Sequence, residues 1–207
     1  MRIRHRVETP ERSASCYTAQ PMPELSRRAL LSSLAASSFF ALSRPAQATL
    51  VRGLKLAELV GRSSCVVQLT AREAVSHYVM LGGRRSIVTD TRVQVEATLA
   101  KGATLPAELD VRTLGGVVDG VGELVHGQAQ LELGQRSVGF LVEAGGVHWV
   151  TGMAQGHYPL RFEPGRDALL EASRNLPTIR DWEASAVKQL AGQSLTSARR
   201  LLSELSR

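Results

Sequence analysis

The side chains of this sequence that could carry out acid–base or metal chemistry are a few scattered histidines and carboxylates. Four histidines follow residue 49, and they are His77, His126, His148 and His157. Imidazoles exchange protons near neutral pH and bind zinc, but zinc hydrolases hold two of them four residues apart on a helix, as in H-E-x-x-H. The sequence contains no such pair. A site assembled from distant strands stays open, with His148 and His157 beside an acidic residue such as Asp90.

Nucleophilic chemistry has little support in the sequence. The chain contains no G-x-S-x-G motif. Cys65 lies in an apolar alternating segment, where we expect it to be buried and unreactive. Asp90 and Glu96 lie on one face of the same predicted strand and are interpreted as solvated charges that pair with Arg92. The sequence therefore predicts no catalytic residue and no cofactor, and it leaves a metal ion only at the non-local site named above.

One group of neighbouring residues combines aromatic and polar side chains. Trp149 and Tyr158 each follow a histidine, His148 and His157. Such a group can form the floor of a ligand groove, although packing in the core and in turns is the favoured interpretation. These four residues and Asp90 are the candidate binding residues.

The element that must position Asp90 is a long strand predicted over 84–102, the longest alternating stretch in the chain. Its odd positions are apolar or small, and its even positions carry the charges. The odd face contains Ile87, Thr89, Thr91, Val93, Val95, Ala97 and Leu99, and the even face contains Val88, Asp90, Arg92, Gln94, Glu96 and Thr98. Because the charged even face is expected to contact solvent, we expect an antiparallel sheet with the odd face in the core.

Further short strands separated by glycine turns complete the predicted sheet. Gly82-Gly83 suits a tight hairpin turn. The glycines of 115–122 are interpreted as turns and a bulge, since their order fits no nucleotide-binding loop. The predicted fold is mainly β, a small antiparallel barrel or sandwich, OB-like or similar, with a short N-terminal helix and a C-terminal helical tail. The predicted strands are 65–70, 74–81, 108–114, 128–133, 137–143, 147–153 and 158–162.

Helical patterns flank these strands. Residues 49–61 carry Leu56, Leu59 and Val60 at helical spacing, and Gly61 suits the end of that helix. Near the C-terminus, a capping pattern at Thr178 and a possible cap at Ser194 predict two more helices. We expect this tail to pack on its own domain, with an apolar stripe for a partner as the alternative. The predicted divisions are an N-terminal extension and signal at 1–48, a β domain at 49–163, and a linker and helical tail at 164–207.

The N-terminal region has the features of a twin-arginine export signal. Arg27-Arg28 precedes an apolar run over 29–42, and Ala46-Gln47-Ala48 matches a cleavage site. That run of 14 residues is shorter than the roughly 20 needed to span a bilayer. We therefore expect cleavage after Ala48, no stable membrane span afterwards, and a periplasmic or secreted protein. The start is either Met1 or Met22.

Removal of residues 1–48 leaves a nearly neutral chain. That segment carries 7 Arg and 3 acidic residues, so the remainder holds 25 − 7 = 18 basic and 19 − 3 = 16 acidic side chains, a net charge of +2. The basic residues of the remainder are scattered, whereas nucleic-acid binding requires a positive stripe. We therefore expect no nucleic-acid partner. Cys65 stays without a second cysteine, because Cys16 lies in the removed segment.

The chain also resembles a family of exported, uncharacterised bacterial proteins over about residues 50–163. The similar stretches are LVRGLKLAELVGRSSCVVQ, RRSIVTDTRVQVEATLAKG, VRTLGGVVDG, GQRSVGFLVEAGG and VTGMAQGHYPL. Such chains are similar to small β modules found alone or near matrixin-like metalloproteases. The resemblance implies export and a β fold, but no activity, and the zinc-binding helix of those proteases does not occur in this sequence.

Three hypotheses for the function follow. The favoured one is an exported, non-enzymatic β domain that binds a partner protein or a cell-envelope component. The alternative is a metal-dependent, hydrolase-like enzyme with a groove near His148 and His157. The third is a small-molecule carrier with its ligand inside the barrel, which is disfavoured because the predicted core residues are large enough to fill the interior.

Overall fold

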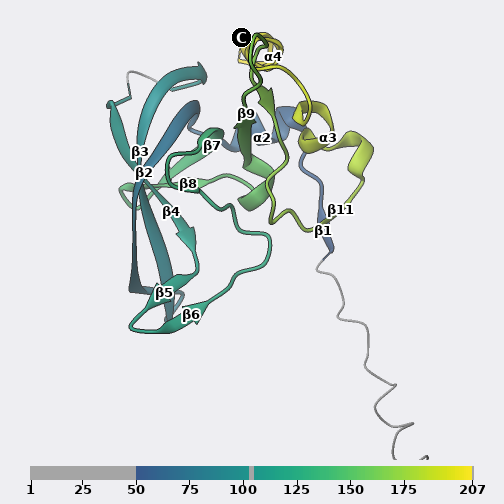
Figure 1. The fold of residues 1–207 in the computed structure, drawn as a ribbon. Coiled ribbons are helices and arrows are strands. Elements are labelled where there is room, and N and C mark those ends of the chain that lie inside the picture. Colours follow the sequence, from purple (N-terminus) through teal and green to yellow (C-terminus); the bar gives the residue numbers. More distant parts are fainter. Residues whose placement is uncertain (1–49, 103–104, 207) are drawn as a thin grey trace, which may run out of the picture. The chain divides into compact units, whose positions relative to one another are not determined.

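The structure is a computed structural model that describes residues 50–102 and 105–206, which belong to one compact unit of the chain (Figure 1). The fold of these residues is mainly β, with a sheet of seven strands, a short helix near residue 60 and a C-terminal helix. The predicted fold class is confirmed. Within the described ranges, no helix has the length and apolar character needed to cross a membrane.

The centre of the sheet is a long hairpin of β2 (Cys65–Leu81) and β3 (Arg84–Ala100) (Figure 1). Gly82 and Gly83 have φ angles of 56° and 79°, the left-handed values that a two-residue hairpin turn requires. The predicted turn is therefore confirmed. The prediction of two separate strands, 65–70 and 74–81, is wrong, because they form one strand that bends at a register shift between Ala71 and Glu73.

Up to Val95, the strand β3 buries its odd face, as its alternating sequence predicts. Ile87 and Val93 are at most 2% exposed, whereas Arg92 and Gln94 are exposed. Beyond Val95 the prediction is wrong, because register shifts against β2 place Ala97 and Leu99 on the side of the helices and pair Thr98 with Val67. Between 87 and 95, Val88 is the exception. It lies on the even face but is fully buried between its neighbours on the two adjacent strands.

Five strands pair in a ring. β3 pairs antiparallel with β4 (Glu108–Leu114), β4 pairs parallel with β8 (Val147–Val150), and β8 pairs antiparallel with β7 (Arg136–Ala144), which pairs with β2. This connectivity is OB-like. Only two residue pairs join β4 to β8, so the barrel is not closed along its length. Beyond β7, β9 (His157–Arg161) and β10 (Leu169–Leu170) extend the sheet.

Two clusters of buried side chains lie on the two faces of β2. Cys65, Val67 and Leu69 belong to a cluster inside the barrel, with side chains from β3, β4, β7 and β8. Val66 points the other way and belongs to a second cluster with Phe140 and residues of the helices. Cys65 is a free thiol that is 1% exposed, and burial raises its pKa, so the predicted burial of this cysteine is confirmed.

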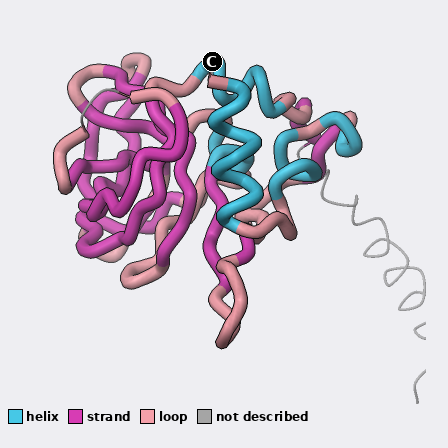
Figure 2. The backbone as a smooth tube through the Cα atoms, turned by 90° about the horizontal axis from the view of Figure 1, so that it is seen from above, coloured by secondary structure: helices cyan, strands magenta, loops and turns pink. Residues whose placement is uncertain are grey.

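The helices lie together beside the strands (Figure 2). They are α2 (Leu56–Arg62), α3 (Ala186–Leu190) and α4 (Leu195–Leu205). In α4, Ala198 and Leu202 repeat at helical spacing and are fully buried in the cluster that contains Leu59 of α2 and Phe140 of β7. The expected packing of the C-terminal tail on its own domain is therefore confirmed.

The ends of these helices differ partly from the prediction. Helix α2 continues through the predicted end at Gly61 to Arg62. Its C-cap is Ser63, whose backbone N–H donates to the carbonyl oxygen of Val60. Thr178 caps no helix, because β11 (Thr178–Arg180) pairs in parallel with β1 (Leu50–Arg52). The cap of α3 is Ser185, which follows the short 3-10 turn η3 (Trp182–Ala184). The predicted cap of α4 is confirmed, since Ser194 accepts a hydrogen bond from the backbone N–H of Ser197.

The glycine-rich segment after β4 forms a short hairpin of β5 (Gly116–Val118) and β6 (Val121–Glu123), in agreement with the predicted turns. The predicted strand at 128–133 is wrong. These residues form no strand; the backbone oxygen of Gln128 accepts a hydrogen bond from the Asn175 side chain, and the backbone N–H of Gln135 donates to the carbonyl oxygen of Glu132. The predicted strand at 147–153 ends at Val150, because Gly152 adopts a φ of 69° and starts the 3-10 turn η2 (Met153–Gly156).

Candidate binding surface

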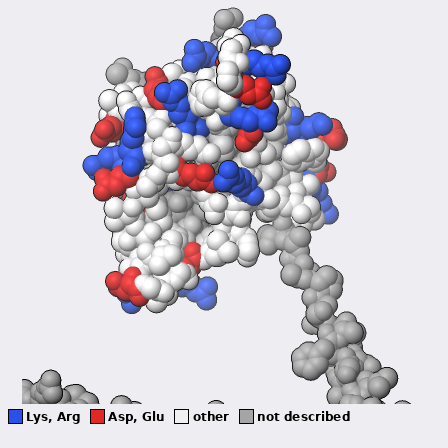
Figure 3. All heavy atoms as spheres, viewed as in Figure 1, with Lys and Arg blue, Asp and Glu red and all other residues white. Residues whose placement is uncertain are grey.

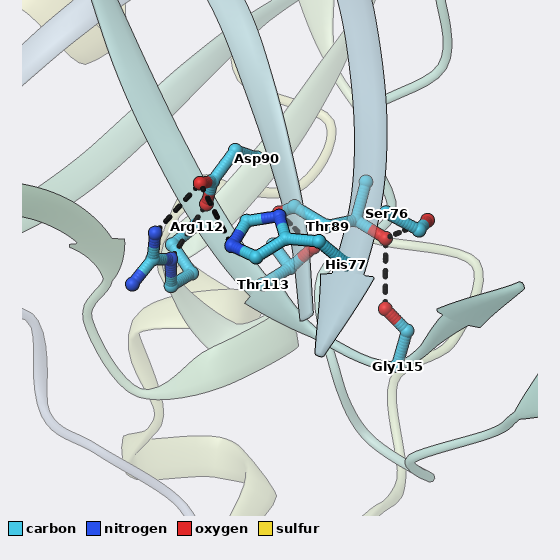
Figure 4. Close-up of polar contacts among 7 residues, drawn as sticks. All are labelled: Ser76, His77, Thr89, Asp90, Arg112, Thr113 and Gly115. Carbon is cyan, nitrogen blue, oxygen red and sulfur yellow. Dashed lines mark hydrogen bonds and ion pairs between the residues drawn. The ribbon is translucent and has the colours of Figure 1, made fainter. Parts of the chain in front are cut away.

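Three side chains, an acidic one, a basic one and an aromatic one, form a row across the outer face of the sheet. Asp90 of β3 pairs with Arg112 of β4, and Arg112 pairs with Trp149 of β8. Paired residues on neighbouring strands share a face, so these side chains are neighbours although their strands are far apart in the sequence. His77 of β2 lies beside Asp90 on the same face (Figure 4). We call these four residues the Asp90 surface.

The ion pair between Asp90 and Arg112 is bidentate. Arg112 Nε donates to Asp90 Oδ1 and Arg112 Nη2 donates to Asp90 Oδ2, both at 2.6 Å (Figure 4). Hydrogen bonding from Arg112 lowers the pKa of the Asp90 carboxyl against the opposing effect of partial burial, and the same bond raises the pKa of Arg112. Both groups are therefore charged at neutral pH, and the planar guanidinium is held in one orientation.

His77 and Trp149 extend this pair on two sides. His77 Nε2 lies 3.7 Å from Asp90 Oδ2. The Cζ atom of Arg112 lies 5.9 Å from the centroid of the Trp149 ring, within the range of a cation–π contact. The surface thus offers an imidazole, a carboxylate, a guanidinium and an indole in a fixed arrangement.

A shallow depression of about 240 Å³ adjoins Asp90. Its lining includes Val75, which is 55% exposed, and the exposed ion pair of Arg92 with Asp110, whose Nε and Oδ1 atoms are 3.3 Å apart. Glu73 completes the lining. The depression therefore combines an apolar side chain with charges of both signs, and acidic and basic side chains are also interspersed on the face of the molecule in Figure 3.

The hydroxyl groups near His77 belong to the opposite face. Ser76 precedes His77 in β2, and consecutive residues of a strand point to opposite sides. Ser76 Oγ lies 2.9 Å from Thr89 Oγ1, which donates to the carbonyl oxygen of Gly115 at 2.7 Å (Figure 4). Ser76, His77 and Asp90 therefore form no nucleophile–base–acid chain, despite their suitable residue types.

The structure separates the five residues predicted to bind. Asp90 and Trp149 are joined through Arg112. His148 pairs with the buried Val111 and so lies on the face opposite Trp149. His157 and Tyr158 lie in β9 at 1% and 0% exposure.

The burial of His157 and Tyr158 determines their chemistry. Within the described residues, both ring nitrogens of His157 and the hydroxyl of Tyr158 lack a hydrogen-bond partner. Burial lowers the pKa of His157 to about 4 and raises that of Tyr158, so both are uncharged at neutral pH. The Tyr158 ring packs edge-on against Phe140 with centroids 5.8 Å apart. These two residues lie in the core, and the described residues contain no group of three His, Cys, Asp or Glu side chains suited to a metal ion.

Sequence reasoning missed His77 and Arg112 as members of the surface. The alternation of 108–114 places Arg112 on the outer face, but that of 74–81 groups His77 with the apolar Val75 and Val79. The partner of Asp90 depends on the register between β3 and β4. No tight turn joins these strands, so the sequence left that register open. The predicted signal residues Arg27, Arg28, Ala46 and Ala48 lie outside the described residues.

Comparison of the chain with protein-family models, with curated proteins and with solved structures found no match.

Proposed function

We propose that this chain is an exported, non-enzymatic β domain that binds a partner protein or a cell-envelope component through the Asp90 surface. The observation that carries the proposal is the row of Asp90, Arg112 and Trp149 across three strands. Export rests on the sequence signals at Arg27-Arg28 and Ala46-Gln47-Ala48.

The composition and rigidity of the Asp90 surface support binding. Tryptophan and arginine are the residues that most often dominate the energy of protein interfaces. Asp90 holds Arg112 by two hydrogen bonds, so this side chain loses little further freedom when a partner covers it. Val75 adds exposed apolar area beside the charged groups, and the pair of Arg92 and Asp110 provides a polar rim.

The geometry offers less to the hydrolase-like alternative. That hypothesis needs His148 and His157 in one groove, but His157 is 1% exposed and uncharged at neutral pH. A general base must reach the proton that it removes, and a group buried this deeply does not meet a substrate at the surface. The alternative therefore gains no supporting contact from the described residues.

The proposal is tested by capture of partners from envelope extract with the purified protein as bait. We expect Trp149→Ala and Arg112→Gln each to weaken binding by about 2 kcal/mol, or roughly thirtyfold. Trp182→Ala is the matched control, because this second tryptophan is 38% exposed in η3, outside the Asp90 surface. A partner retained equally by all three variants would contradict the assignment of the surface.

A further inference from the structure

A cavity of about 220 Å³ lies on the inner face of β3 and β4, the face opposite the Asp90 surface. Thr91 and Thr113 contribute to its wall from these two strands, and Gln128 and Gln130 contribute from the loop after β6. The group of Ser76, Thr89 and Gly115 in Figure 4 borders the same end of the strands. The cavity is independent of the proposed partner-binding function.

Several polar groups of this wall have no partner in the protein. Thr91 is 2% exposed and Gln128 is 6% exposed, yet within the described residues neither the Thr91 hydroxyl nor the Gln128 side-chain amide makes a hydrogen bond. In that part of the chain, only His157 and Tyr158 hold unpartnered polar atoms that are sealed from solvent. Thr91 and Gln128 both line the cavity, so a ligand or water there can satisfy these groups.

The loop wall of the cavity is fixed before any ligand binds. Asn175 Nδ2 donates to the backbone oxygen of Gln128 at 3.2 Å. The backbone N–H of Ala154 donates to the carbonyl oxygen of Gly127 at 2.8 Å. The backbone N–H of Gly134 donates to the carbonyl oxygen of Ala71, also at 2.8 Å. A wall held at both ends in this way loses little conformational freedom on binding, which favours affinity for a small ligand.

The lining determines the class of ligand. Among the described residues that line the cavity, Glu123 alone has an ionisable side chain, and its Oε2 accepts a hydrogen bond from the backbone N–H of Ile87 at 2.7 Å. Hydroxyls and amides both donate and accept, so they match a ligand that does the same, and no cation is present for an anionic one. Leu114 and Leu131 supply apolar contact, and the volume is below the roughly 300 Å³ of drug-sized pockets.

We infer that this cavity binds one uncharged, hydroxyl-rich ring, such as a single sugar unit or a cyclitol. The test is a titration of the isotope-labelled protein with glucose, N-acetylglucosamine and myo-inositol, followed by the backbone amide resonances. At least one probe shifts the amides of Thr91, Thr113 and Gln128 saturably, with a dissociation constant on the order of 1 mM. Glucose 6-phosphate binds more weakly than glucose, because nothing in the wall compensates its charge.

Three variants make the test specific. Thr91→Val removes a hydroxyl at constant volume, and Ala74→Phe obstructs the cavity from an exposed wall position, so each weakens binding about tenfold or more. Thr98→Val is the control, since Thr98 lies exposed near the end of the same strand and does not line the cavity. Trp149→Ala leaves the titration unchanged, which separates this site from the Asp90 surface. The inference is overturned if no neutral probe gives saturable shifts at its solubility limit, or if Ala74→Phe binds as tightly as the wild type.

Discussion

Acidification should destabilise this protein mainly through one buried histidine, His157. The ring is 1% exposed, and both of its nitrogens lack partners within the described residues. In the unfolded chain its pKa returns to about 6.5, whereas burial holds the folded value at about 4. Between these two values the unfolded state binds the proton and the folded state does not.

The sign and size of the effect follow from this difference in proton binding. Stability from neutral His157 is fully present above about pH 6.5, falls as the pH drops toward 4, and falls no further below that value. A difference of about 2.5 pKa units corresponds to about 3 kcal/mol, of which about 2.5 kcal/mol is lost between pH 7.5 and 4.5. For a domain of ordinary stability, this is a large fraction of the total.

Urea unfolding at a series of pH values measures this loss, with tryptophan fluorescence as the signal. His157→Leu replaces the ring with an apolar side chain of similar size, so the variant should lose most of the pH dependence between pH 4.5 and 6.5 without a large loss of stability at pH 7.5. His126→Gln is the matched control, because His126 is exposed in a loop, and it should keep the wild-type slope. A wild-type stability that is constant over this interval, or a slope that survives in His157→Leu, would refute the reasoning.

Three further predictions concern packing, turns and export. Leu202→Ala should lower the free energy of unfolding by about 3 kcal/mol, whereas Leu205→Ala, 41% exposed on the same helix, should change it by no more than about 0.5 kcal/mol. Gly116→Ala should cost about 2 kcal/mol or more, because its φ is 140° and its Cβ would overlap hydroxyls of β2 and β3. Gly134→Ala, with a φ of 77° and open space, should cost about 1 kcal/mol in the same unfolding measurement. Replacement of Arg27 and Arg28 by Lys should stop export in a secretion assay, and unchanged secretion would argue against the twin-arginine signal.

The features that the sequence predicted correctly are those with a local cause. The alternation of β3 up to Val95 follows from its own residues, and the turn at Gly82-Gly83 follows from two adjacent glycines that tolerate positive φ. The cap of α4 at Ser194 is likewise a contact over three residues. Each of these can be deduced without knowledge of the rest of the fold.

The features that escaped prediction depend on distant parts of the chain. Thr178 belongs to a strand because it pairs with Leu50. The segment 128–133 pairs with no strand, and the backbone oxygen of its first residue, Gln128, bonds instead to the distant Asn175 side chain. β2 continues as one strand through a bulge between Ala71 and Glu73, and this continuity depends on its pairing with β3. In the candidate site, Asp90 was recognisable as an outer residue, but its partner Arg112 depends on strand register and therefore on the folded sheet.

The most direct test of the proposed function is photo-crosslinking in cells that export the protein. A crosslinking amino acid placed at Val75, 55% exposed beside Asp90, should form one dominant adduct that decreases strongly when Trp149→Ala is added. The same amino acid at Phe162, 53% exposed directly after β9, should not form that adduct. No adduct at Val75, or the same adduct from both positions with and without Trp149, would contradict a partner-binding role for the Asp90 surface.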